Sequence, residues 1–271
     1  MTSSSEIPHD RLPEGFARRV RPPENPATPR PAATVVLMRP VSRNRGGLEV
    51  LLLRRIRSAG FVPGAWVFPG GRVDDGDADP RLVSQLDDPG GAPASALVAA
   101  IREAFEETGI LLARDARGDH APPAASDPDV DRLRIDLLEG ALSFLEILDH
   151  GPWRMDPDAV GYIAHWITPE AEPRRYDTRF FAAAVAAGTP ERIHDAELTH
   201  SAWLTPAEAL HRHADGELPM IFPTIKTLEA LRPFESPAEV LEYHRGREIP
   251  AILPTLVHTP TGVGVRMPDE H

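Results

Sequence analysis

Three carboxylates stand in one predicted helix at a spacing that suits a metal ion. Glu103, Glu106 and Glu107 occupy positions i, i+3 and i+4 of the stretch 102–110, so in a helix they project from one face. Like charges placed in this way repel by roughly 0.2–0.5 kcal/mol per pair, and Arg102 beside them offsets only part of that repulsion. Hard divalent cations take oxygen ligands, and the chain has no cysteine for a thiolate site. The cluster therefore predicts a Mg²⁺ or Mn²⁺ site, with a solvated acidic helix face as the alternative.

The residues around this cluster resemble the Nudix box. That pattern is Gly, five residues, Glu, seven residues, and then Arg-Glu-apolar-any-Glu-Glu-any-Gly-apolar. Its second half matches residues 102–110, with Ala104 at the apolar position, and a Phe-Pro-Gly-Gly loop at 68–71 supplies the first glycine, Gly71. The resemblance to Nudix hydrolases implies an α+β fold, in which a mixed β-sheet is sandwiched between α-helices (α/β/α).

The first half of the box departs from the family pattern. Asp77 stands where the pattern has its first Glu, and the role of that Glu is not carried over to Asp77. Arg102 follows Gly71 by 31 positions where the pattern has 14, so 17 residues are inserted. Residues 74–95 are rich in Asp, Pro and Gly, which is typical of a loop. We expect the insertion to bulge from the surface ahead of the box helix.

Further motifs narrow the resemblance to one subgroup. Leu-Leu-Leu-Arg-Arg at 51–55 and the run at 60–71 are similar to the coenzyme A diphosphatase-related Nudix proteins of the nucleoside diphosphate-linked moiety X motif 19 type. The resemblance covers roughly residues 33–232, because later stretches agree with the subgroup in order and spacing. These stretches are 166–169, 176–181, 202–206 and 223–228.

The resemblance implies roles for the box residues. Glu106 and Glu107 correspond to metal ligands, and Glu103 corresponds to a metal ligand or the general base. Arg102 corresponds to the group that orients Glu103 through a charge-assisted hydrogen bond. The adjacent glycines at 70–71 (Gly70 and Gly71) would let the loop backbone pass close to the metal and the substrate.

Other charged residues are candidates for substrate or metal contacts. Arg54, Arg55 and Arg57 lie near the end of a predicted strand, where at least one could bind substrate phosphates such as the 3′-phosphate of coenzyme A; surface salt bridges are the alternative. Arg179 is either a strand-surface cation or a substrate clamp. Glu197 corresponds to the late Glu that completes the metal shell in many Nudix enzymes, and an exposed acid is the alternative.

Together these features predict a metal-dependent diphosphatase that acts on a nucleoside diphosphate linked to another group. The subgroup resemblance makes coenzyme A or acyl-CoA the first-choice substrate, with 3′,5′-ADP and (acyl-)phosphopantetheine as products. Since pocket residues choose the substrate, NADH, ADP-ribose or another dinucleotide is the alternative among enzymes. The alternative of another class is a non-catalytic ligand sensor, which loss of a box carboxylate would favour; all three are present.

Composition narrows the partners and the location. The chain has 271 residues and a formal net charge of −12, which argues against a nucleic-acid backbone as partner. Without cysteine, disulfides and thiol catalysis are excluded. No apolar run approaches the ~18–20 residues that cross a bilayer, and no signal-peptide core stands at the N-terminus. We therefore expect a cytoplasmic protein without a membrane partner; a homodimer remains open.

The chain divides into three parts. Residues 1–31 are Pro-rich and are expected to form a flexible arm, residues 32–235 the Nudix domain, and residues 236–271 a C-terminal extension with strand-like pieces at 249–253 and 262–267. Periodicity and composition predict strands at 33–39, 48–54, 65–68, 160–167, 178–186 and 197–204, and helices at 96–112, 130–149, 206–213 and 223–231.

Overall fold

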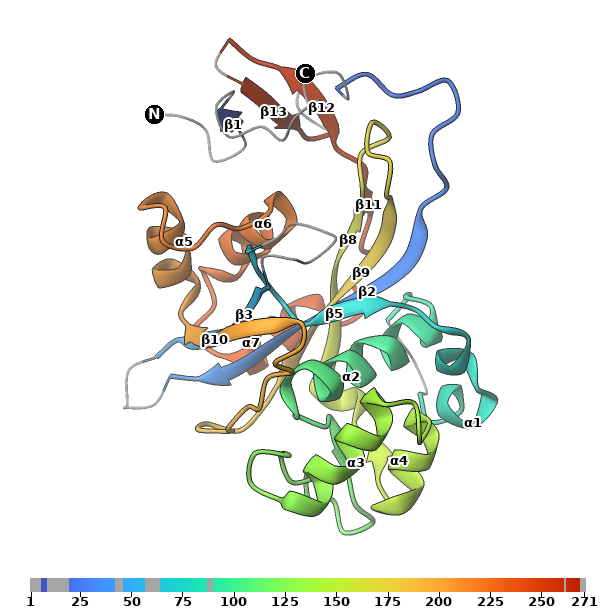
Figure 1. The fold of residues 1–271 in the computed structure, drawn as a ribbon. Helices are drawn as coiled ribbons and strands as arrows, with labels where there is room; N and C mark the ends of the chain where they lie inside the picture. The colour runs from blue at the N-terminus through green and yellow to red at the C-terminus, as the bar shows by residue number, and fades with distance from the viewer. Residues whose placement is uncertain are drawn as a thin grey trace.

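A mixed β-sheet with helices on both faces forms the centre of the molecule (Figure 1). The computed structural model describes residues 6–8, 20–41, 46–56, 64–86, 90–260 and 262–268. The strands of this sheet are β2 (Arg30–Pro40), β3 (Leu48–Arg55), β4 (Trp66–Val67), β5 (Gly70–Arg72), β8 (Val160–Ile167), β9 (Tyr176–Ala184), β10 (Leu198–Leu204) and β11 (Ala251–Ile252). Their order is β10-β3-β2-β9-β8-β11, with β4 paired to β3 and β5 to β2. Since β2–β9 and β8–β11 are parallel while β2–β3 and β8–β9 are antiparallel, the expected mixed sheet is confirmed.

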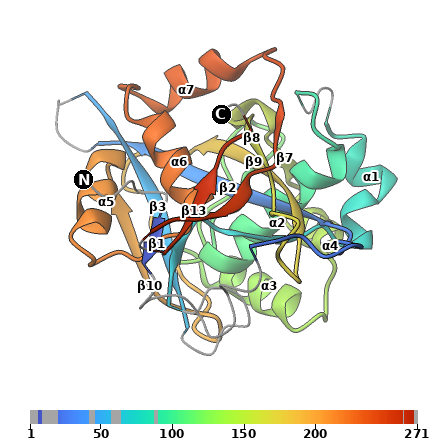
Figure 2. The same ribbon diagram turned by 90° about the horizontal axis from the view of Figure 1, so that it is seen from above.

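Two groups of helices cover the two faces of the sheet, as the view from above shows (Figure 2). One face carries α1 (Pro80–Val83), α2 (Ala94–Thr108), α3 (Pro128–Leu138) and α4 (Phe144–His150), and the other carries α5 (Pro206–Ala214), α6 (Phe222–Leu231) and α7 (Pro237–His244). Strand alternation creates the two cores: along β2, Val35 and Leu37 pack beneath α2, whereas Val36 and Met38 pack on the side of α6. We call these sides the α2 face and the α6 face. The α/β/α arrangement predicted from the sequence is confirmed.

The two ends of the chain meet in a small sheet. Its strands are β1 (Glu6–Pro8), β12 (Thr255–His258) and β13 (Gly262–Arg266), in the order β1-β13-β12. The arm expected at 1–31 therefore contains strand β1, and its last two residues belong to strand β2. In the C-terminal extension, α7 buries Val240 in the core of the α6 face, and β11 joins the main sheet.

The inserted segment is packed into the fold rather than looped outward. It contains a 3₁₀ helix η3 (Asp75–Ala78) and helix α1, and Asp79 caps α1 by accepting a hydrogen bond from the backbone N–H of Arg81. Leu82 and Leu86 lie in the core of the α2 face, and Asp77 is only 1% exposed. The expectation of a surface loop is wrong for these residues. Its Asp and Pro residues act as helix caps and first-turn residues, which have the same composition as a loop.

The helix expected over 130–149 is divided into α3 and α4. Gly140 follows the end of α3 with a φ of +71°, a conformation that suits glycine. The hydroxyl of Ser143 then accepts from the backbone N–H of Glu146, whose carboxylate accepts from the N–H of Ser143. This capping box starts α4 as a separate helix, although the apolar spacing continues across the break. A short strand pair, β6 (Ala113–Arg114) with β7 (Arg154–Met155), and the 3₁₀ helix η4 (Pro157–Ala159) complete the described fold.

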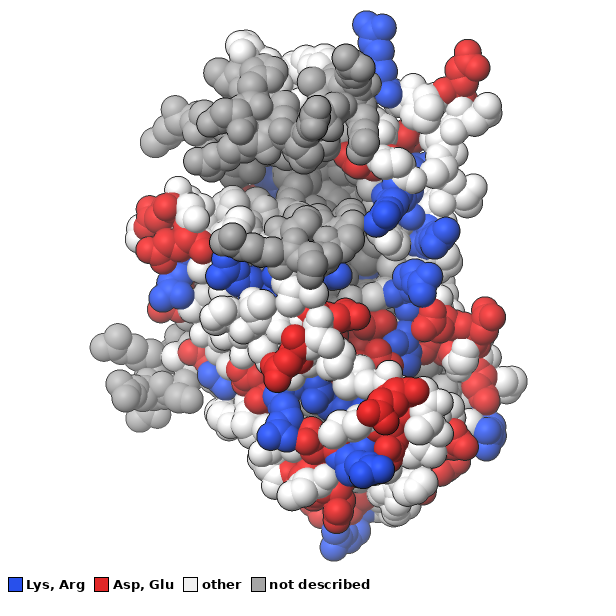
Figure 3. Space-filling view, viewed as in Figure 1, with Lys and Arg blue, Asp and Glu red and all other residues white. Residues whose placement is uncertain are grey.

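Charges of both signs are intermixed on the face shown in Figure 3. Asp and Glu side chains lie among Lys and Arg over α3 and α4, and the described part of this face has no broad basic area. None of the helices among the described residues is long and apolar enough to cross a membrane.

Candidate active site

Helix α2 carries the box residues beneath the main sheet. It ends at Thr108, and Gly109 follows as its left-handed cap with a φ of +70°, donating its N–H to the carbonyl of Phe105 at 2.8 Å. The helix begins at Ala94, with Pro93 at the N-cap. Its contacts with β2 and β5 turn the acidic side toward the glycine loop.

A single guanidinium joins three carboxylates. Arg102 donates through Nε and Nη2 to the two oxygens of Asp77 at 2.8 and 3.0 Å, and through Nη1 to Glu103 at 2.9 Å and Glu106 at 3.1 Å. Its Nη2 also donates to the carbonyl of Arg72 at 3.0 Å. Burial alone would lower the pKa of Arg102, but the hydrogen bond to Asp77 and the neighbouring carboxylates raise it above its ordinary value. Arg102 is thus a fixed cation whose orientation is set by Asp77.

Asp77 is the residue beside Arg102 to which the sequence assigned no role. Its carboxylate also accepts from the backbone N–H of Asp74 at 2.8 Å, so both oxygens are held. The signal lay in the spacing, because Asp77 stands six positions after Gly71, where the box has its first Glu. Asp77 was not matched to this Glu because its side chain is shorter and the insertion follows it. Its hydrogen bonds with Arg102 support the match.

The glycine loop presses directly on the carboxylates. The backbone N–H of Gly70 donates to Oε2 of Glu107 at 3.0 Å. A Cβ on Gly71 would lie 2.3 Å from Oε1 of Glu103, and one on Gly70 would lie 2.5 Å from the carbonyl oxygen of Ala33. Neither position can accept a side chain without moving the loop or the acid.

The environment makes these acids hard to ionise. Burial raises the pKa of Glu103 to about 7, with Glu106 adding to the rise and Arg102 opposing it. Burial also raises the pKa of Glu106. For Glu107, burial and then the charge of Glu103 raise the pKa well above its usual range, while the Gly70 N–H and the charge of Arg55 oppose the change. A further cation beside the cluster would therefore favour its ionised form.

Strand β3 directs its two arginines to opposite faces. Arg55 continues the alternation of Leu51 and Leu53, which face α2, and its charge acts on Glu107. Its Nε is buried and has no hydrogen-bond partner among the described residues. Arg54 continues the alternation of Leu52 on the α6 face, away from the box. Arg57, the third candidate, lies outside the described residues.

The two remaining candidates differ in their distance from the cluster. The charge of Glu197 raises the pKa of Glu107, so the two carboxylates are neighbours although they are far apart in the sequence. Arg179 lies on β9 in register with Ala33, which is itself in register with Gly71. It therefore stands two strands away from the loop and forms an ion pair with Asp177, a residue hydrogen-bonded to His165 at 2.5 Å. The structure brings Glu197 to the cluster and does not bring Arg179 there.

Glu103, Glu106, Glu107 and Glu197 are the candidate ligands for a metal ion. Within the described part of the chain, no group of three or more His, Asp or Glu side chains is placed so that it could hold a metal ion. Two of these acids, Glu103 and Glu106, also form ion pairs with Arg102. The arrangement provides some carboxylate ligands and leaves the rest of a coordination shell to water or a bound molecule.

Comparison with known proteins agrees with this geometry. The family described as NUDT19 Nudix domain matches residues 84–231, which is more than half of the chain. The chain belongs to this Nudix family. The match includes α2 and its box residues and begins after Asp77, so the first half of the box lies outside it.

The chain is also similar in sequence to individual curated Nudix proteins. The chain is 27% identical over 219 residues to the acyl-coenzyme A diphosphatase NUDT19 of Xenopus laevis, covering 65% of this chain and 57% of that protein. It is 30% identical over 236 residues to the protein of the same name from Gallus gallus, covering 69% and 62%. The chain therefore spans about three fifths of the length of these curated relatives.

A solved structure supports the fold over a larger share of the chain. The crystal structure of a NUDIX hydrolase from Alicyclobacillus acidocaldarius is 32% identical, has a TM-score of 0.70, and covers 80% of this chain and 96% of its own. The Nudix fold thus extends beyond the residues of the family match.

Proposed function

We propose that this chain is a Mg²⁺- or Mn²⁺-dependent diphosphatase that hydrolyses coenzyme A or acyl-CoA to 3′,5′-ADP and (acyl-)phosphopantetheine. The observation that carries the proposal is the cluster of Glu103, Glu106 and Glu107, of which Glu107 is buried, held against the glycine loop. Similarity to proteins named acyl-coenzyme A diphosphatase supports the substrate class.

The chemistry of the donor set fits a hard divalent cation. Mg²⁺ takes one or two carboxylates and completes its shell with water and substrate phosphates, so the cluster needs to supply only part of the shell. In our proposal Glu106 and Glu107 are the ligands, Glu197 is a further ligand candidate beside them, and Glu103 is the general base. The bound metal would neutralise phosphoryl charge and lower the pKa of a bound water.

The side chains of the box accept a proton and orient one another in our proposal. Arg102 holds Oε1 of Glu103, and we place the proton of the attacking water on Oε2. A carboxyl with a pKa of about 7 is suited to accept a proton at neutral pH. Water adds to one phosphorus of the diphosphate and the bridging P–O bond breaks, which leaves two phosphate monoesters. Asp77 keeps Arg102 in place by its two hydrogen bonds.

Arg55 is the cation that we assign to the substrate. It lies on the α2 face close to Glu107, and its buried Nε has no hydrogen-bond partner among the described residues. A guanidinium can bind a phosphate through two parallel N–H donors. Gly70 and Gly71 act indirectly, since they position Glu107 and Glu103.

Product analysis tests the proposal. The purified protein is incubated with Mg²⁺ or Mn²⁺ and, in separate reactions, coenzyme A, acetyl-CoA, a long-chain acyl-CoA, NADH, ADP-ribose or a diadenosine polyphosphate, and the products are separated by liquid chromatography. We expect 3′,5′-ADP from the coenzyme A compounds to form faster than AMP from the others, and chelation by EDTA to stop the reaction.

The other outcomes discriminate between the alternatives. AMP from NADH or ADP-ribose alone would overturn the coenzyme A assignment and keep the diphosphatase. No cleavage of any compound with either metal would overturn the enzymatic proposal and favour the ligand sensor.

A further inference from the structure

The carboxyl end of α2 is held by groups from outside the helix. The last carbonyls of a helix have no partner within it, and here they belong to the turn that carries Glu106 and Glu107. Arg134 of α3 donates through Nε to the carbonyl of Phe105 at 3.0 Å and to that of Glu106 at 2.9 Å. The backbone N–H of His194 donates to the carbonyl of Glu107 at 3.3 Å, and that of Arg192 donates to the carbonyl of Thr108 at 2.7 Å.

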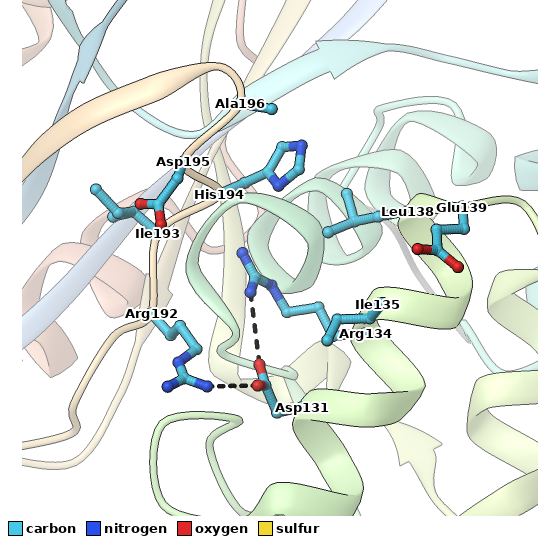
Figure 4. A pocket seen from close by; sticks show the side chains of 10 residues that line it. All are labelled: Asp131, Arg134, Ile135, Leu138, Glu139, Arg192, Ile193, His194, Asp195 and Ala196. Atoms are coloured by element: carbon cyan, nitrogen blue, oxygen red, sulfur yellow. Dashed lines mark hydrogen bonds and ion pairs between the residues drawn. The ribbon is translucent and has the colours of Figure 1, made fainter.

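Asp131 connects the two sides of this arrangement (Figure 4). It forms an ion pair with Arg134 of its own helix at 3.7 Å. It also accepts a hydrogen bond from Arg192, which lies on the other side of a pocket between α3 and residues 192–196. Arg134 is 3% exposed, so it is a buried cation placed at the negative end of the α2 dipole. We call Asp131, Arg134 and Arg192 the α3 clamp.

The same clamp fixes the segment that leads to Glu197. Residues 192–196 run along the end of α2, and the N–H of Glu197 donates to the carbonyl of His194 at 3.1 Å. Glu107 and Glu197 belong to separate elements that are joined through the backbone of His194, so the separation of the two carboxylates depends on how this segment docks on α2. The clamp touches α2 at the turn of Glu106 and Glu107 and touches the segment at Arg192.

We infer that Arg134 is a positioning residue, which sets the metal-binding geometry by holding the backbone of Glu106 while its partner Asp131 holds the segment before Glu197. This inference rests on the proposed function, because it concerns the metal that those carboxylates would bind. Arg134 acts through the backbone and does not touch the substrate. Removing such an outer partner lowers metal affinity by about 10–100-fold in characterised metal sites.

Mn²⁺ binding without substrate is the direct test. Free Mn²⁺ is titrated by electron paramagnetic resonance against the wild-type protein, Arg134→Met, Arg134→Lys and Arg192→Met, at a temperature well below every melting temperature. We expect Arg134→Met to weaken binding by about 10-fold or more. Arg134→Lys should fall between it and the wild type, since an ammonium keeps the charge without the planar fork. Activity lost by Arg134→Met at low Mn²⁺ should recover in part at high Mn²⁺.

Arg132 provides the matched control. It lies on the same helix with its side chain 75% exposed and pairs only locally with Asp136, so Arg132→Met should bind Mn²⁺ within about twofold of the wild type. Wild-type affinity in Arg134→Met would overturn the inference, even if its melting temperature fell, and would make Arg134 a structural cap alone. If Arg134→Met does not fold, unchanged affinity in both Arg134→Lys and Arg192→Met would overturn it. A wild-type protein that binds no Mn²⁺ would instead remove the proposed function and this inference together.

Discussion

The two faces of the main sheet share the same strands but differ in the side chains that their helices bury. On the α2 face, α2 and α3 bury Arg102, Glu107 and Arg134, whereas the buried polar side chains of α6 are two threonines, Thr224 and Thr227. Burial of a charge costs several kcal/mol unless it is paired. The contrast supports our proposal that the active site lies on the α2 face.

The same contrast occurs within one strand. Arg54 and Arg55 are neighbours in the sequence, yet alternation sends them to opposite faces, and the charge of Arg55 acts on Glu107. Residues that look equivalent in a sequence motif can therefore have different roles.

Removing the charges of the α2 face should have the largest effect. We expect the double variant Glu106→Gln and Glu107→Gln to lower the rate of diphosphate hydrolysis by orders of magnitude, because it removes two proposed metal ligands. Glu242→Gln on the exposed surface of α7 is the control and should retain wild-type rates. An active double variant would show that these acids do not hold the metal.

The same double variant should be stabilised when no metal is present. Burial raises the pKa values of Glu106 and Glu107 above those of the unfolded chain, so the folded state loses stability as the pH rises through the folded values. Glutamine stays neutral and removes that loss. In EDTA at pH 8 we expect a higher melting temperature for the double variant than for the wild type, measured by circular dichroism.

Substitution of Asp77 tests how much its pairing with the buried Arg102 contributes to stability. Asp77→Ala leaves Arg102 without its two-oxygen partner and should lower the free energy of unfolding by about 3–5 kcal/mol, as measured in urea. Asp75→Asn, at an exposed position of the same 3₁₀ helix, is the control. Equal stability of the Asp77 and Asp75 variants would contradict the assignment of Asp77 as the anchor of Arg102.

Alanine substitutions of one leucine in the insertion and one in helix α6 compare how much each segment's packing contributes to the free energy of unfolding. Leu82 in the insertion is 1% exposed and Leu228 in α6 is fully buried, so alanine at either position should lower the free energy of unfolding by about 2–5 kcal/mol. Arg81→Ala beside Leu82 should have little effect, because its side chain is 69% exposed. A Leu82→Ala variant as stable as Arg81→Ala would restore the surface-loop interpretation.

The arginine pair gives the smallest and most specific effect. Arg55→Met should raise KM for the diphosphate substrate about 10-fold, the size expected for loss of a hydrogen bond to a charged group, whereas Arg54→Met should stay within about twofold. Steady-state kinetics at saturating metal measure both. A larger effect from Arg54 would reverse the assignment of the two faces.

The sequence by itself determined the local features of this protein. The spacing of Glu103, Glu106 and Glu107 defines one helix face, Gly109 ends that helix, and the family resemblance follows from the same residues. The β-branched runs predicted the central strands to within a few residues of their bounds. These signals survive because helix and strand periods and glycine caps depend on near neighbours in the chain.

Tertiary structure alone decided which distant residues meet. Asp77 reaches Arg102 across 25 positions, and Arg134 reaches the carbonyls of α2, each through the packing of separate elements. The insertion had the composition of a loop, yet apolar burial of Leu82 and Leu86 made it part of the core. Composition reports what a segment contains, whereas burial and pairing depend on the surface that the rest of the fold presents to it.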